Sequence, residues 1–334
     1  MFRLRGIPVQ RRGIHHRQSV LNAVHEIREC LSDVDGISIS HNDAKALVAN
    51  ALQHPLSSSS DLFFHKRRSK GEPLAYVIGR KEFWSLEFKV TRDTLIPRSD
   101  SEILIETLMD QFHPETPLRI LDIGTGSGCL LLSALSEFPR ATGVGIDISA
   151  GALAIAKENA QSNKLEERSE FLLRDLKTLP GLRSDVAEDE ALFRRFDVIL
   201  CNPPYIPGRE LDLVGPDVLK YEPHIALFSG GAATADNSDL DPKGLRMYRL
   251  LHESVDNLFN HESGDARQDR KLRKICLLVE IGSEDQAREV KELFSSSTKA
   301  AVLQSEGSSR LRLQFERYLF DTSGKYRGLL FRGP

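Results

Sequence analysis

Four consecutive residues, Asn202, Pro203, Pro204 and Tyr205, carry groups that can grip a planar amine. The Asn202 side chain offers one acceptor and two donors, and the Pro203 carbonyl, followed by a second proline, has a nearly fixed direction. Asn202 Oδ1 and that carbonyl can together accept both protons of one NH₂ group, while Tyr205 adds an aromatic face. This set suits a carboxamide or an exocyclic amine better than a phosphate or a hydroxyl. An ordinary Asn-Pro turn is the alternative.

A buried strand leads directly into this turn. Residues 198–201 form a continuous apolar run, which is typical of a strand covered on both faces of a parallel sheet. The two prolines then stop any regular structure. Open α/β sheets bind their ligands at the carboxyl ends of such strands, so the turn is placed where a ligand is expected. Asp197 precedes the strand, and we expect a structural role for it.

A glycine-rich loop forms the second candidate. Residues 119–123 predict a strand, and a predicted helix begins after the loop that they lead into. Glycines at such a turn let the backbone approach a ligand, and the helix N-terminus supplies free N–H groups. The third glycine comes one residue earlier than in the dinucleotide fingerprint, and a lone glycine loop leaves a NAD-binding unit as an alternative. The loop residues are Gly124, Thr125, Gly126, Ser127 and Gly128.

Acidic residues end the next two predicted strands. Residues 143–148 carry Asp147, which can accept both hydroxyls of a ribose. Residues 171–174 lead to Asp175, placed to take an adenine amino group. No P-loop lysine motif is present, so these acids fit an adenosyl ligand without phosphates.

The remaining elements complete an α/β fold. A helix is expected over 243–259, a fifth strand over 275–281, a helix over 284–295, and a terminal hairpin over 311–320 and 326–331. Strands alternating with helices predict a doubly wound, mostly parallel sheet, here with a C-terminal antiparallel hairpin. The polar stretches at 180–195, 232–243 and 260–274 are interpreted as surface insertions and loops.

The chain is expected to begin with a targeting segment and a helical module. Residues 1–20 are rich in arginine and no acid precedes Glu26, a composition typical of a mitochondrial transit peptide; a basic arm is the alternative. Helical periodicity predicts a small helical domain over 21–75, a β-hairpin linker over 76–98, and the main domain over 99–334.

Composition narrows the classes of function. The net charge of −3 gives no global field that favours nucleic acid, and no apolar run approaches the length of a membrane span. The four cysteines are widely spaced and form no C-x-x-C pair. We therefore expect reduced, mostly buried thiols and no metal site.

The motifs together resemble one family. N-P-P-Y is similar to the signature of S-adenosylmethionine-dependent amino-methyltransferases. The words GEPLAYVIG, EFW and TLIPR between 71 and 98, the segment 217–223, and the pattern of Asp321, Gly324 and Arg327 resemble the HemK/PrmC family of protein-glutamine methyltransferases. The family usually has Pro-Asp-Thr-Glu where this chain reads Ser-Asp-Ser-Glu at 99–102, and often tryptophan where it has Leu176.

This resemblance implies a seven-stranded methyltransferase sheet and S-adenosyl-L-methionine as cofactor. The implied substrate is the side-chain amide nitrogen of the glutamine in the Gly-Gly-Gln motif of a class I peptide-chain release factor, in a ribosome-associated context. Asn202, Pro203, Pro204 and Tyr205 would be catalytic. The cofactor would lie against Asn202, Asp147, Asp175 and the glycine loop. A monomer in the mitochondrial matrix, without membrane or nucleic-acid contact, is expected.

Three other functions stay open from sequence. A base-amine methyltransferase would use the same turn but would need a basic groove. A non-catalytic protein that binds a release factor or the ribosome would keep the fold without the reaction. A NAD-dependent oxidoreductase would leave the N-P-P-Y turn unexplained.

Overall fold

The computed structural model describes residues 67, 70–230, 241–260, 275–295 and 313–333. The chain divides into two compact units, Met1–Ile78 and Gly79–Pro334. In the first unit the structure describes one helix, α4 (Leu74–Ile78). The targeting segment and the helices predicted between 21 and 66 lie outside the described residues, as does most of the predicted loops at 232–243 and 260–274.

The larger unit is built on a seven-stranded sheet with the order β5-β4-β3-β6-β7-β9-β8. The five strands from β5 to β7 are parallel, and β9 and β8 continue the sheet antiparallel. The chain therefore steps outward from β3 through β4 to β5 and then returns to β6 on the other side of β3. The strands are β3 (Arg119–Ile123), β4 (Thr142–Asp147), β5 (Ser169–Leu173), β6 (Val198–Cys201), β7 (Cys276–Glu280), β8 (Gln314–Phe320) and β9 (Tyr326–Arg332).

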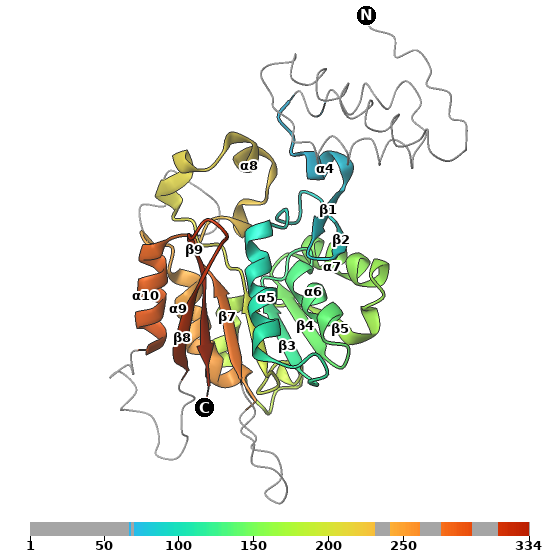
Figure 1. Cartoon of the computed structure of the whole chain (residues 1–334), viewed down its shortest axis with the longest axis vertical. Helices are drawn as coiled ribbons and strands as arrows, with labels where there is room; N and C mark the ends of the chain where they lie inside the picture. Colours follow the sequence, from blue (N-terminus) through green and yellow to red (C-terminus); the bar gives the residue numbers. More distant parts are fainter. Residues whose placement is uncertain (1–66, 68–69, 231–240, 261–274, 296–312, 334) are drawn as a thin grey trace, which may run out of the picture. The chain divides into compact units, whose positions relative to one another are not determined.

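This topology, which Figure 1 shows as a sheet flanked by helices, confirms the predicted doubly wound fold with its C-terminal hairpin. One face of the sheet packs on α5 (Glu102–Gln111), α6 (Cys129–Glu137) and α7 (Ala150–Ser162). The other face packs on α9 (Arg246–Leu258) and α10 (Glu284–Ser295). Neighbouring residues of β6 alternate between these two cores, which explains its unbroken apolar run.

Short helices connect these elements along the chain. They are η1 (Ser99–Ser101), η2 (Glu166–Arg168), η3 (Leu176–Gly181), η4 (Ala187–Asp189), η5 (Gly208–Leu213), α8 (Pro216–Tyr221) and η6 (His224–Ala226).

The predicted linker hairpin packs into the larger unit. Strands β1 (Arg80–Phe83) and β2 (Leu86–Lys89) pair antiparallel. Phe83 and Phe88 are buried in the core beneath α5 and α6. At the turn, the Trp84 backbone N–H donates to Glu102 at 2.7 Å. These contacts join the hairpin to the core of the larger unit rather than leaving it as a free connection.

Two predicted surface insertions are partly buried, so that interpretation was wrong in part. Within 180–195, Leu182 and Leu192 are 6% and 0% exposed and belong to the core on the α9 side. The Asn257 amide of α9 donates to the Pro180 carbonyl at 2.9 Å. At the end of 232–243, the buried Asp241 carboxylate accepts the first N–H groups of α9, which sets the start of that helix at Arg246. Both segments are polar on average, so the sequence did not reveal that single positions within them are buried or cap a helix.

No helix in the described part of the chain is long and apolar enough to cross a membrane. The three described cysteines, Cys129, Cys201 and Cys276, are free, and Cys201 and Cys276 are buried. Among the described residues no group of His, Cys, Asp and Glu side chains is arranged to hold a metal ion.

Candidate active site

Strand register brings the predicted site residues to one edge of the sheet. Ile123, the last residue of β3, pairs with Ile146 on one side and with Cys201 on the other. The glycine loop, Asp147 and Asn202 follow these paired positions and so lie side by side. A methyl group placed on Gly124 would lie 3.9 Å from the Asn202 carbonyl oxygen.

Hydrogen bonds fix the glycine loop in an unusual backbone shape. Gly124, Gly126 and Gly128 have φ values of 73°, 54° and 81°, a region that other residues adopt at a cost. The Gly124 and Thr125 N–H groups both donate to the Ile146 carbonyl, at 2.9 and 3.0 Å. The Gly126 N–H donates to Asp147 Oδ2 at 2.9 Å. The loop and the end of β4 are therefore one hydrogen-bonded unit.

Asp147 and Asp175 are placed differently. Asp147 accepts the N–H groups of Gly126 and Ser149 with separate carboxylate oxygens, and burial raises its pKa. Each oxygen keeps a second lone pair, so a role for Asp147 with ribose hydroxyls stays compatible with the geometry. Asp175 lies two positions beyond the end of β5 and caps η3, accepting the Lys177 N–H at 3.0 Å. Its assignment to adenine stays a prediction.

The acceptors at this edge fit an adenosyl ligand. Asp122 in β3 accepts the Thr125 hydroxyl at 2.7 Å, and burial raises its pKa to about 7. Asp122 Oδ1 and Ser127 Oγ are buried polar atoms with no partner among the described residues. Carboxylates repel phosphates but accept hydrogen bonds from hydroxyl and amino groups, and they favour a nearby positive charge. The acceptors at this edge therefore suit a ligand that donates hydrogen bonds better than one that carries phosphates.

The N-P-P-Y turn is held at both ends. At its start, Asn202 Nδ2 donates to Ser101 Oγ at 3.2 Å. At its end, the Tyr205 carbonyl accepts from Gln286 Nε2 at 2.7 Å. The Tyr205 ring lies against Gly282, where an added methyl group would come within 2.7 Å of the ring. Because the Asn202 NH₂ group is anchored on Ser101, the Oδ1 atom points to the opposite side and remains an acceptor.

Comparison with known proteins places this arrangement in a family. Residues 115–294 match the sequence profile of a family described as a methyltransferase domain. The chain is 38% identical over 184 residues to a release factor glutamine methyltransferase of Caulobacter vibrioides, which covers 55% of this chain and 60% of that protein. It is 32% identical over 308 residues to the protein of that name in Agrobacterium fabrum, covering 89% of this chain and 92% of that relative.

The chain belongs to the release factor glutamine methyltransferase family. This confirms the resemblance that the motifs predicted. The matched region nevertheless spans only 60% of the Caulobacter vibrioides relative and 52% of a Bradyrhizobium diazoefficiens relative that is 40% identical. The mitochondrial assignment stays a prediction.

The sequence segments that resemble the family contact one another around the turn. The Glu222 carboxylate, buried within the segment 217–223, accepts the Ile96 N–H at 3.0 Å and pairs with Arg98 at 2.5 Å. Arg327 pairs with Asp100 at 2.8 Å and with Asp321 at 2.9 Å. The TLIPR segment thus contacts the segment 217–223, and the C-terminal hairpin contacts η1 through an ion pair.

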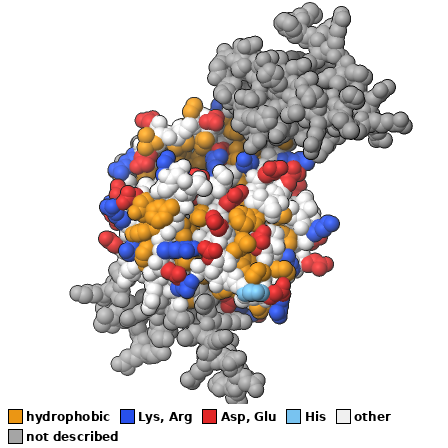
Figure 2. Space-filling view, in the orientation of Figure 1, with side chains coloured by type: hydrophobic (Ala, Val, Ile, Leu, Met, Phe, Trp, Pro, Cys, Tyr) orange, Lys and Arg blue, Asp and Glu red, His pale blue; other side chains and the backbone are white. Residues whose placement is uncertain are grey.

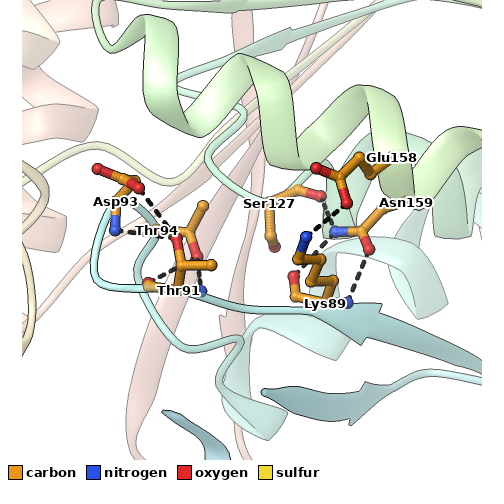
Figure 3. A network of polar contacts seen from close by, with 7 residues as sticks. All are labelled: Lys89, Thr91, Asp93, Thr94, Ser127, Glu158 and Asn159. Atoms are coloured by element: carbon orange, nitrogen blue, oxygen red, sulfur yellow. Dashed lines mark hydrogen bonds and ion pairs between the residues drawn. The ribbon is translucent and has the colours of Figure 1, made fainter.

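A second network joins the hairpin to the glycine loop. The Asn159 side chain of α7 accepts the Lys89 N–H at 2.7 Å and donates to the carbonyls of Lys89 and Ser127 at 3.0 and 2.8 Å (Figure 3). Asn159 is 1% exposed, so each of these hydrogen bonds replaces water that is excluded from the site. The Lys89 ammonium also pairs with Glu158 at the surface. Asn159 therefore fixes the loop relative to β2.

Sequence reasoning missed two side chains at the turn, Ser101 and Glu280. Glu280 ends β7 as an acid after four buried apolar residues, the same signal that singled out Asp147. It is 3% exposed, and burial raises its pKa to about 7. Ser101 carries no such signal, because a lone serine in a polar stretch predicts nothing about its partner.

The surroundings of the turn carry charges of both signs. A cavity of about 520 Å³ adjoins Tyr205, and its lining includes Arg209, Lys243, Asp285 and Glu289. On the face drawn in Figure 2, acidic and basic side chains are interspersed with apolar ones. Among the described residues drawn there, neither sign of charge forms a continuous stripe.

Proposed function

We propose that this protein transfers a methyl group from S-adenosylmethionine to the side-chain amide nitrogen, N5, of the glutamine in the Gly-Gly-Gln motif of a class I release factor. The observation that carries the proposal is the Asn202 side chain. Its NH₂ group is anchored on Ser101, which leaves Oδ1 as an acceptor, and the Asn202 backbone itself lies against Gly124 of the glycine loop. Two such acceptors match the two protons of a primary amide.

The turn has a clear task in this reaction. An amide nitrogen is a poor nucleophile because its lone pair is delocalised into the carbonyl. Asn202 Oδ1 and the Pro203 carbonyl accept both amide protons, which raises the electron density on nitrogen and fixes its direction. Positioning of this kind supplies several kcal/mol. The same acceptors stabilise the positive charge that develops on nitrogen, which is discharged when the nitrogen loses one of its two protons to water.

The cofactor would be held by the glycine loop, Asp147 and Asp175. When bound, S-adenosylmethionine supplies an electrophilic methyl group on a sulfonium. Residues 124–128 offer a backbone that comes close to a ligand, and Asp147 offers acceptors for ribose hydroxyls. The Tyr205 ring lies over Gly282 and provides a flat apolar surface in the same turn.

We further propose that the protein works as a monomer in the mitochondrial matrix, on a release factor in a ribosome-associated context. The support for the location is compositional, since residues 1–20 are arginine-rich and acid-free. The release-factor context follows from the family resemblance.

The direct test is methyl transfer from labelled S-adenosylmethionine to a purified Gly-Gly-Gln release factor, with a Gly-Gly-Ala version of the same factor as control. The label is expected in the first protein only and to map to the glutamine. Label in DNA or RNA instead would identify a base-amine methyltransferase. Cofactor binding without transfer to any of these substrates would point to a non-catalytic binding protein.

A further inference from the structure

A buried carboxylate lies beneath the catalytic turn. Glu280, the last residue of β7, is 3% exposed, and its Oε2 atom has no hydrogen-bond partner among the described residues. Ser101 and Asn202 both lower the pKa of this carboxylate as hydrogen-bonding side chains, and the two are joined to each other at 3.2 Å. Tyr248 holds the strand end in place, because its hydroxyl donates to the Glu280 backbone carbonyl at 2.9 Å.

The direction of these hydrogen bonds is forced by their chemistry. The amide nitrogen of Asn202 can only donate, so Ser101 Oγ accepts at 3.2 Å. The single Ser101 proton is then free for the Glu280 carboxylate, which can only accept when ionised. If the Asn202 amide were rotated by about 180°, its Oδ1 atom would face the carboxylate, and two hydrogen-bond acceptors would repel each other. The carboxylate thereby selects one of the two amide orientations.

We propose that Glu280 is a positioning residue for the methyl transfer: directly and through Ser101 it holds the Asn202 amide in the one orientation that presents Oδ1 to the substrate. This inference rests on the proposed function. Glu280 would thus orient the Asn202 amide from a different strand, and no sequence motif assigned this role to it.

The surroundings of Glu280 show that its charge is held at a cost. Arg327 of β9 attracts the carboxylate, and Asp100 of η1 opposes that attraction. Burial outweighs both, so the pKa lies near 7. The other titratable groups that the carboxylate influences are Tyr205, Tyr248, Cys129 and Cys201. A glutamine would fill the same space without charge, so a purely packing role would not require an acid here.

The first arm of the test observes the amide itself. Asparagine is labelled with ¹⁵N, and the side-chain NH₂ signals of Asn202 are assigned by their loss in Asn202→Ala. In the wild-type protein these signals are expected to move with pH, with a midpoint near 7. In Glu280→Gln they are expected to lose that titration. Asn202 NH₂ signals that have the same chemical shifts and the same pH response in wild type and in Glu280→Gln would overturn the inference.

The second arm measures turnover on a Gly-Gly-Gln release factor. Glu280→Gln and Ser101→Ala are each expected to lower kcat roughly 10- to 100-fold, with S-adenosylmethionine affinity within about twofold of wild type. Ser101→Thr keeps the hydroxyl and is expected to retain most of the activity. The double variant Ser101→Ala/Glu280→Gln is expected to lose little more than either single one, because both break the same chain of hydrogen bonds.

A matched control, in which another buried acid is replaced, distinguishes this role from the general effect of losing a buried carboxylate. Asp197 is 4% exposed, precedes β6, and accepts the Arg119 N–H at 2.9 Å far along the strand from the turn. Asp197→Asn is expected to keep wild-type kcat. Normal kcat in Glu280→Gln, or equal losses of kcat in Glu280→Gln and Asp197→Asn, would overturn the positioning role. A wild-type protein without any methyl transfer would overturn the proposed function instead, and the amide signals would still decide whether Glu280 orients Asn202.

Discussion

Replacing Asn202 with aspartate tests the two-acceptor turn most sharply. The side chain keeps its shape and one acceptor, but both donors are lost. In the structure the Asn202 nitrogen donates to Ser101 Oγ at 3.2 Å, and the Asn202 side chain lowers the pKa of the buried Glu280 carboxylate. Asn202→Asp therefore places a negative charge against an acid that is already buried.

The size of the effect follows from these contacts. A hydrogen bond to a charged group contributes about 1.5–3 kcal/mol and a neutral one about 1 kcal/mol. Losing both hydrogen bonds removes a similar free energy from the correct placement of the remaining acceptor. A loss of about 2.7 kcal/mol corresponds to a 100-fold lower rate. We expect at least that loss for Asn202→Asp at pH 8, with much smaller changes in S-adenosylmethionine affinity. Asn202→Ala is expected to lose at least as much.

The pH dependence gives the prediction its direction. Two adjacent carboxylates raise the pKa of one of them, so a proton is taken up as pH falls toward 6. A protonated aspartate can donate to Glu280 or Ser101 as the amide does, and its other oxygen still faces the substrate. The ratio of wild-type to Asn202→Asp turnover is therefore expected to shrink several-fold between pH 8 and pH 6.

The assay is single-turnover methylation of a Gly-Gly-Gln release factor at saturating cofactor, with cofactor affinity measured by calorimetry at each pH. Near-normal turnover in Asn202→Ala would refute the two-acceptor mechanism. A deficit in Asn202→Asp that stays constant across pH would refute the coupling between this side chain and Glu280.

Four further outcomes are expected. Asp147→Ala should weaken S-adenosylmethionine binding by about 1–3 kcal/mol in calorimetry, because ribose hydroxyls lose a charged acceptor; unchanged affinity in a folded variant would remove Asp147 from the site. Gly244→Ala should lower the free energy of unfolding by about 2 kcal/mol or more in urea, because φ is 67° and the new methyl group would come within 2.1 Å of the Tyr205 carbonyl oxygen. Burial raises the pKa of Glu280 from 4.5 to about 7, so its protonated form favours the fold and that stability is lost as pH rises from about 5 to 8; relative to Glu280→Gln, the wild-type free energy of unfolding should fall by about 3 kcal/mol over this window, and parallel pH profiles would contradict the burial argument. A reporter fused to residues 1–25 should enter mitochondria, and a cytosolic reporter would favour a plain basic arm.

The sequence by itself determined the frame of the site. Continuous apolar runs identified the buried strands, and the residues that stop each run identified the ligand edge. The turn at 202–205, the glycine loop and Asp147 were found in this way, because each has a local signature that does not depend on distant partners. Their positions next to one another followed from parallel pairing, which the register of β3 with β4 and β6 confirms.

Only the tertiary structure decided how the turn is oriented. Asn202 and Ser101 lie 101 positions apart in the chain, and nothing in the polar stretch around Ser101 predicts that its hydroxyl meets the Asn202 amide. Glu280 carried a readable signal, an acid at the end of a buried strand, but its partners come from η1 and from the loop after β6. The same reason explains Leu182 and Leu192, whose burial depends on α9 rather than on their polar neighbours. Periodicity and motifs report what a segment prefers locally, whereas the direction of one amide group depends on side chains that only folding brings together.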